Sequence, residues 1–108
     1  MNFFDIIERG DLNILLERIN DKDENGQSPL HIAVKLNLFD YVTILIKNGA
    51  YVNAQDEDAI TPLHVAIGGN YTDCITVLIN NGADIHIKSN YENTPLDDAE
   101  SDELKLLM

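Results

Sequence analysis

One six-residue motif occurs three times in this chain, and the interval between successive copies is constant. The copies begin at Ser28, Thr61 and Thr94, and each has proline second, leucine third and alanine sixth. A second marker, Gly49 followed by Ala50, recurs after the same interval at Gly82. A fixed interval of this length predicts a stack of similar units, each of which buries its apolar side against its neighbours.

Each position of the motif has a physical role at the start of a helix. The Ser or Thr side chain accepts a hydrogen bond from a backbone N–H of the first turn, and proline follows where its missing N–H costs nothing. The leucine is expected to be buried, and the alanine is small enough for a second helix to lie close. Three helices are therefore expected to begin near residues 29, 62 and 95.

The 33-residue period, with T-P-L-H-x-A followed by a second helix ending in G-A-x-V/I-N, resembles the ankyrin repeat over nearly the whole chain. The resemblance implies an all-α solenoid of stacked helix-turn-helix units with hairpin-like loops. Two departures concern single positions. Asp97 replaces histidine in the third motif, where an acid faces the positive end of the helix dipole. The loop glycine, Gly26, is replaced by Ala59 and Glu92, so those two loops are expected to bend differently.

We expect one domain, residues 1–108, made of four units. They are an N-terminal cap repeat, two full repeats and a truncated C-terminal cap repeat, over residues 1–24, 25–57, 58–90 and 91–108. The step from Gly10 to the equivalent Asn37 is shorter than the period, so the loop over residues 20–26 is expected to be shortened. Terminal units that differ from the others are typical of a repeat stack, because one side of each meets water.

Two further expectations concern helix ends. Gly68 and Gly69 close the first helix of the second full repeat, and glycine costs about 1 kcal/mol in a helix, so this helix is expected to be short or frayed. At the end of the chain, Leu104, Leu107 and Met108 are expected to cover the open end of the stack. A longer native protein remains open as an alternative.

The charge balance limits the kinds of partner. The chain has 19 acidic and 7 basic residues, a formal net charge of −12. This charge repels a phosphate backbone, so nucleic acid is not expected as a partner; it serves solubility or attracts a basic protein or peptide. The only cysteine, Cys74, cannot form an intrachain disulfide. With no membrane-length apolar run and no signal peptide pattern, we expect a cytoplasmic monomer that contacts no membrane.

No group of residues predicts catalysis. His31 and His64 occupy matching places in neighbouring repeats, which lie roughly 10 Å apart, too far for both rings to bind one zinc ion at about 2 Å. The resemblance implies that their rings bond the capping hydroxyl and nearby loop backbone. Residues 21–26 fit the first half of an EF-hand calcium loop, but Ile32 occupies the place of its final glutamate. We expect no enzyme, cofactor or metal site, and keep a calcium-responsive protein as an alternative.

The resemblance implies that a partner binds the loop tips and the exposed side of each first helix. The predicted protein-binding residues are Glu24, Asn25, Gln27, Lys35, Leu36, Glu57, Asp58, Ile60, Asn90, Tyr91 and Asn93. Glu8, Arg9, Gly68 and Gly69 belong to the same predicted surface.

Three members of this set, Leu36, Ile60 and Tyr91, are apolar or aromatic residues for which the fold has no obvious need. An exposed aromatic side chain with aliphatic neighbours has the composition of an interface hot spot. The alternative is that these are scattered surface apolar residues. We predict a non-enzymatic protein–protein interaction module; a targeting or regulatory fragment of a larger effector or enzyme is the other possibility.

Overall fold

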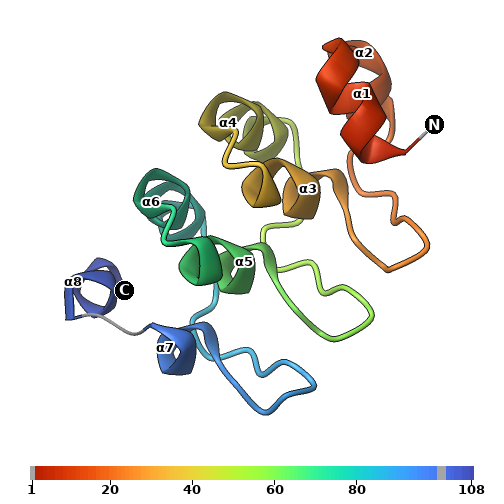
Figure 1. Cartoon of the computed structure of the whole chain (residues 1–108). Helices are drawn as coiled ribbons and strands as arrows, with labels where there is room; N and C mark the ends of the chain where they lie inside the picture. The colour runs from red at the N-terminus through yellow and green to blue at the C-terminus, as the bar shows by residue number, and fades with distance from the viewer. Residues whose placement is uncertain (1, 100–101) are drawn as a thin grey trace.

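The computed structural model describes residues 2–99 and 102–108, with only the backbone of Asp102 and Glu103. Its helices are α1 (Phe3–Arg9), α2 (Leu12–Glu17), α3 (Pro29–Lys35), α4 (Phe39–Lys47), α5 (Pro62–Gly69), α6 (Thr72–Asn80), α7 (Pro95–Asp98) and α8 (Asp102–Leu107). In Figure 1 the odd-numbered helices form a row beside the loops, and the even-numbered helices form a second row on the far side. The predicted all-α solenoid of helix pairs is confirmed.

Each first helix begins at the predicted proline. Ser28, Thr61 and Thr94 precede α3, α5 and α7, and each side chain accepts a hydrogen bond from the backbone N–H of the third helical residue. The side chain of that third residue accepts in turn from the backbone N–H of the Ser or Thr, which closes the cap reciprocally. The three predicted helix starts are confirmed.

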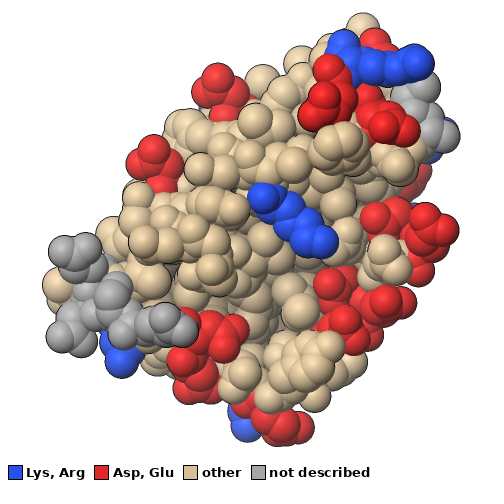
Figure 2. Space-filling model, in the orientation of Figure 1, with Lys and Arg blue, Asp and Glu red and all other residues tan. Residues whose placement is uncertain are grey.

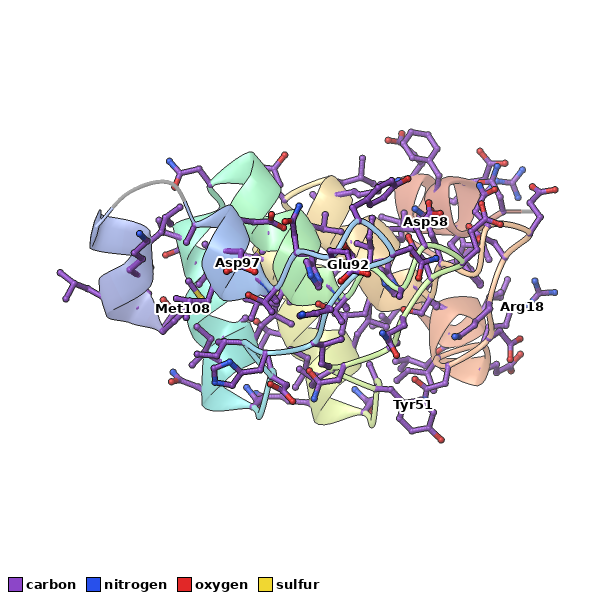
Figure 3. The ribbon with its side chains drawn as sticks, turned by 90° about the horizontal axis from the view of Figure 1, so that it is seen from below. Arg18, Tyr51, Asp58, Glu92, Asp97 and Met108 are labelled. Atoms are coloured by element: carbon purple, nitrogen blue, oxygen red, sulfur yellow. The ribbon has the colours of Figure 1, made fainter. Side chains whose placement is uncertain are left out.

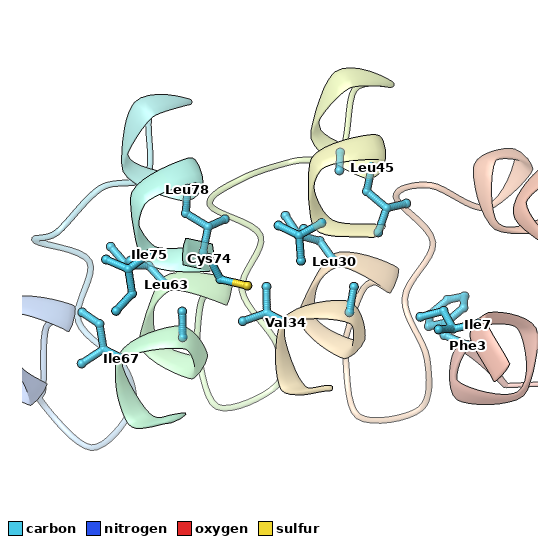
Figure 4. Packing of buried hydrophobic residues seen from close by; sticks show 14 of the residues in the cluster. Phe3, Ile7, Leu30, Val34, Leu45, Leu63, Ile67, Cys74, Ile75 and Leu78 are labelled. Atoms are coloured by element: carbon cyan, nitrogen blue, oxygen red, sulfur yellow. The ribbon is translucent and has the colours of Figure 1, made fainter. Parts of the chain in front are cut away.

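A single apolar core runs along the stack (Figure 4). Leu30 and Leu63 from the first helices, and Leu45 and Leu78 from the second, have no exposed surface. Burying a leucine side chain stabilises a fold by about 1.5–3 kcal/mol. Leu96, the leucine of the third motif, is only partly buried. Burial of the motif leucine is thus confirmed in full for two copies and in part for the third, whose helix α7 has four residues.

The first unit is shorter than the next because it has fewer residues before its loop, while the loop itself has full length. Asn20 Nδ2 donates to the Gly49 carbonyl at 3.0 Å, and Asn20 Oδ1 accepts from the Tyr51 N–H at 2.8 Å. Asn53, the equivalent residue one unit later, makes the same two bonds to the next unit, at 3.1 and 2.8 Å. The chain therefore follows the period from residue 20 onward, whereas α2 has six residues and α4 has nine. The expectation of a shortened loop over residues 20–26 is wrong, because these side-chain bonds fix its register.

The glycine pair does not shorten α5. This helix has eight residues and α3 has seven, and Asn70 ends α5 with a left-handed φ of 57°. A Cβ atom on Gly69 would collide with the Tyr71 ring, whose hydroxyl donates to the Lys35 carbonyl at 3.4 Å. The helix is therefore not short as expected, because packing between neighbouring units opposes the low helix propensity of glycine; fraying of its end stays a prediction.

The last unit ends in the expected brief helix, α8. Leu104 is 6% exposed and Met108 is partly buried, but Leu107 is 37% exposed. The expectation that Leu107 covers the end of the stack is therefore wrong, whereas Leu104 and Met108 pack against the core. The expected tight connection at residues 100–101 lies outside the described residues.

Candidate protein-binding face

Three loops project from the same side of the helices (Figure 1). We name them loops 1, 2 and 3: residues 20–27, 53–60 and 86–93. In loop 1, Asp23 Oδ1 accepts from the backbone N–H groups two and four residues later, at 2.9 and 2.8 Å. Asp56 makes the same two bonds in loop 2, both at 2.9 Å, and Ser89 Oγ makes the first of them in loop 3, at 3.2 Å. Each loop is thus organised by one side-chain acceptor.

All three loops bend alike, although only the first has glycine at the bend. Gly26, Ala59 and Glu92 have φ values of 75°, 59° and 68°. In each loop this residue donates its N–H to the carbonyl three residues earlier, at 2.9, 2.9 and 3.0 Å. The expectation that loops 2 and 3 bend differently is wrong. The shared bonds hold a left-handed conformation that costs a non-glycine residue roughly 1–2 kcal/mol.

Neighbouring loops are also bonded to one another near their tips. The Glu57 N–H donates to the Asn25 carbonyl at 3.1 Å, and the Asn90 N–H donates to the Asp58 carbonyl at 2.9 Å. All four residues belong to the predicted binding set. The backbone of the tips is therefore held in a row before any partner arrives.

His31 and His64 tie each first helix to the loop that follows. His31 Nδ1 accepts from the Ser28 N–H at 3.1 Å, and Nε2 lies 2.8 Å from the Ile60 carbonyl. His64 repeats both bonds one unit later, at 3.1 and 3.0 Å. A nitrogen that accepts from a backbone N–H carries no proton, so each ring is the neutral tautomer that donates from Nε2. The role that the resemblance implied for these histidines is confirmed, since Nδ1 also lies 2.9 Å from the Ser28 hydroxyl in His31 and 2.8 Å from the Thr61 hydroxyl in His64.

Charge is disfavoured on His31. Its side chain is fully buried, and this burial lowers the pKa of the ring below the ordinary 6.5, although the bond to Ile60 and the Asp56 carboxylate oppose the effect. A neutral ring that is hydrogen-bonded at both nitrogens has a structural role, because it connects two units.

The third motif keeps the helix cap but has no histidine to bond to a following loop. The Asp97 carboxylate accepts from the Thr94 N–H at 3.1 Å, as the histidine ring does in the other copies. This bond is the main reason that the pKa of Asp97 is lowered. A carboxylate has no proton to donate to a following carbonyl. The bond from His64 to the Asn93 carbonyl is therefore the last of these histidine bonds along the stack.

The predicted binding residues differ in exposure. The exposed members are Glu24, Asn25, Lys35, Glu57, Asn90, Tyr91 and Asn93. The partly buried members are Gln27, Leu36, Asp58 and Ile60. Leu36 packs against the core, so the fold does use it, contrary to the sequence-based expectation. Figure 2 shows acidic side chains gathered along the loop side of the molecule.

The residues that hold the loops were missed by sequence reasoning. Asn20 and Asn53 form one pair separated by the motif period, and Asp23, Asp56 and Ser89 form a series with the same step. This period was the available signal. It also explains the calcium-like pattern in loop 1, because the Asp23 carboxylate is bonded to its own backbone as Asp56 is in loop 2.

Within the described residues, no three His, Cys, Asp or Glu side chains converge as a metal site would require. None of the helices in residues 2–99 and 102–108 is long and apolar enough to span a bilayer. Cys74 is buried, which together with the nearby Asp73 carboxylate raises the pKa of its thiol.

Paired helices at a constant sequence step, with equivalent loops on one side, define a helical repeat protein. Family models described as ankyrin repeats match residues 45–99 (many copies) and residues 5–56 (3 copies). The chain belongs to the ankyrin-repeat family, as the motif predicted.

A solved structure, the ankyrin repeat domain of Bcl-3, a member of the IkappaB protein family, matches with a TM-score of 0.83 at 35% sequence identity. The match covers 89% of this chain and 44% of the Bcl-3 chain, so this chain spans less than half of its neighbour's length. No curated protein sequence matches this chain.

Proposed function

We propose that this chain is a non-enzymatic module that binds another protein through the tips of loops 1–3 and the exposed sides of α3 and α5. Ankyrin repeats are a common protein–protein interaction fold. The observation that carries the proposal is the row of tips, which backbone bonds between Asn25 and Glu57 and between Asp58 and Asn90 hold in place. A preorganised surface binds without the cost of ordering its loops.

The chemistry of this face favours a basic partner. Glu24 and Glu57 are exposed at the tips, Asp58 is partly exposed, and Glu92 follows at the bend of loop 3. Their charges would attract and orient a lysine- or arginine-rich segment. Tyr91 is 65% exposed beside them and offers an aromatic anchor.

The proposal extends to a monomer in the cytoplasm. Cys74 is the only cysteine, and its thiol is buried in the stack. A lone buried thiol suits a reducing compartment, where disulfides are not needed for stability.

The test begins with affinity capture from the native lysate and continues with calorimetry on the captured partner. The variant Tyr91→Ala with Ile60→Ala should weaken binding of that partner by at least about tenfold, the loss of a hot-spot residue. Tyr51→Ala is the matched control, because Tyr51 is 68% exposed and projects away from Asp58 and Glu92 (Figure 3). Unchanged affinity in the double variant would show that the binding face is misplaced.

A further inference from the structure

A second surface lies on the row of even-numbered helices, away from loops 1–3 (Figure 1). Phe39, the first residue of α4, is 42% exposed. The equivalent first residue of α6 is Thr72, so the helix start does not require an aromatic side chain. The exposed ring therefore has no evident role in the fold.

Phe39 lines two hollows, one of about 330 Å³ and one of about 310 Å³. The first is lined by residues 37–41. The second lies between α4 and α6 and is lined by Phe39, Asp73, Thr76, Val77, Asn80 and Asn81. A volume near 300 Å³ is at the lower end of ligand pockets and suits a single side chain.

Both hollows carry a negative charge. Asp40 lines the first and Asp73 lines the second, and among the described residues no lysine or arginine lines either. Both carboxylates are exposed. A cation that enters the second hollow therefore meets one carboxylate and the ring of Phe39.

We propose that the hollow between α4 and α6 receives an arginine side chain of a partner protein. A guanidinium group can stack on the Phe39 ring and donate two parallel N–H bonds to the Asp73 carboxylate, whereas an ammonium group is a point charge without that planar geometry. Val77 gives the aliphatic stem an apolar contact. Asn81 Nδ2 donates to the Val77 carbonyl at 2.7 Å, which leaves the Asn81 side-chain oxygen as an acceptor for a third N–H.

The experiment titrates the ¹⁵N-labelled chain with N-acetyl-arginine amide at near-physiological salt and follows backbone amide shifts. N-acetyl-citrulline amide, which has nearly the same shape without the charge, is the control ligand, and the lysine derivative tests the planar group. The arginine derivative should cause saturable shifts in residues 72–81 and around Phe39, and should bind about fivefold more tightly than the citrulline derivative.

Variants separate this hollow from the rest of the acidic surface. Phe39→Ala and Asp73→Asn should each remove the preference for arginine over citrulline. Asp40→Asn removes the same charge from the equivalent position one unit earlier and should leave that preference in place, as should Tyr91→Ala on the loop face. Equal shifts with the two ligands, no saturable shifts, or an undiminished preference in Asp73→Asn would overturn the proposal. Thermal unfolding of each variant verifies that it is folded.

Discussion

At the scale of single residues, the stack depends on groups that bond across units. The His31 ring joins the cap of α3 to the Ile60 carbonyl of loop 2, 29 residues away. Asn20, at the start of loop 1, bonds to Gly49 just after α4. Asn53, at the start of loop 2, bonds to Gly82 just after α6. Each of these side chains makes hydrogen bonds to the next unit. Replacing one leaves its partners unpaired, so the loss of stability should exceed what the size of the side chain suggests.

The first prediction concerns pH. Burial lowers the pKa of His31 in the folded chain below 6.5, so the unfolded chain binds the proton more tightly. The free energy of unfolding should be unaffected by this group above about pH 6.5 and should fall below that pH, with a slope of up to about 1.4 kcal/mol per pH unit, until the folded pKa is reached. Urea unfolding between pH 7.5 and 5.0 measures the slope.

Two histidine variants, one test and one control, check this prediction. His31→Asn should be less stable at pH 7.5 and should lose its share of the slope. His86→Gln alters an exposed loop residue and controls for the removal of a histidine as such. A full slope in His31→Asn would assign the pH dependence to other groups.

A second prediction concerns the bend of loop 2. Ala59 has a φ of 59°, a region that glycine adopts without strain. Ala59→Gly should stabilise the chain by about 0.5–1 kcal/mol, because relief of roughly 1–2 kcal/mol of strain exceeds the added freedom of the unfolded chain. Ala54→Gly, in the same loop but without a positive φ, should destabilise. Chemical denaturation of both variants makes the comparison, and equal effects would contradict the prediction.

At the scale of helices, caps decide where α3, α5 and α7 begin, and a neighbouring unit supports the end of α5. The motif hydroxyl and proline lie next to each other in sequence, so the starts of α3, α5 and α7 follow from local chemistry. The end of α5 depends on Tyr71, whose ring lies over Gly69 and whose hydroxyl reaches Lys35 in α3.

The third prediction compares the two glycines of α5. A Cβ atom on Gly68 would meet no atom within 4 Å, whereas one on Gly69 would collide with the Tyr71 ring. Gly68→Ala should therefore stabilise the chain by about 0.5–1 kcal/mol through helix propensity. Gly69→Ala should destabilise it by about 1–3 kcal/mol, because the ring must move. Thermal unfolding distinguishes the two signs, and stabilisation by Gly69→Ala would show that the ring moves freely.

At the scale of the whole molecule, stability is shared along an elongated stack with extents of 38 × 25 × 20 Å. Each unit contacts its neighbours, so a central layer is covered on both sides and a terminal layer on one. Helix α5 packs against α3 on one side and against α7 on the other, whereas α7 packs mainly against α5.

The fourth prediction follows from this difference. Leu63 has no exposed surface and Leu96 is only partly buried, although both hold the third position of the motif. Leu63→Ala should cost about 2–5 kcal/mol, and Leu96→Ala should cost less, because the smaller contact area leaves a smaller cavity. Urea midpoints measure both costs. Equal losses would mean that the terminal layer is as tightly packed as the central one.

Much of the candidate face could be predicted from sequence, because its exposed positions follow the period of the motif. The placement of Tyr91 and Glu57 at loop tips needed only that register. Its finer properties could not be predicted. Leu36 was assigned to the surface but packs on the core, and loops 2 and 3 were expected to bend differently from loop 1. The error for Leu36 concerns packing against distant residues, whereas the error for the loops overlooked the local bonds made by Asp23, Asp56 and Ser89.

The sequence by itself determined the class of fold, the helix starts and the order of the units, because caps, prolines and apolar spacing act within a few residues. The tertiary structure alone decided the register of loop 1 and the support of the last turn of α5 by a neighbouring unit. Those features depend on hydrogen bonds and ring contacts between units, such as Asn20 with Gly49 and Tyr71 with Lys35. Bonds of this kind form only once the helix pairs have stacked.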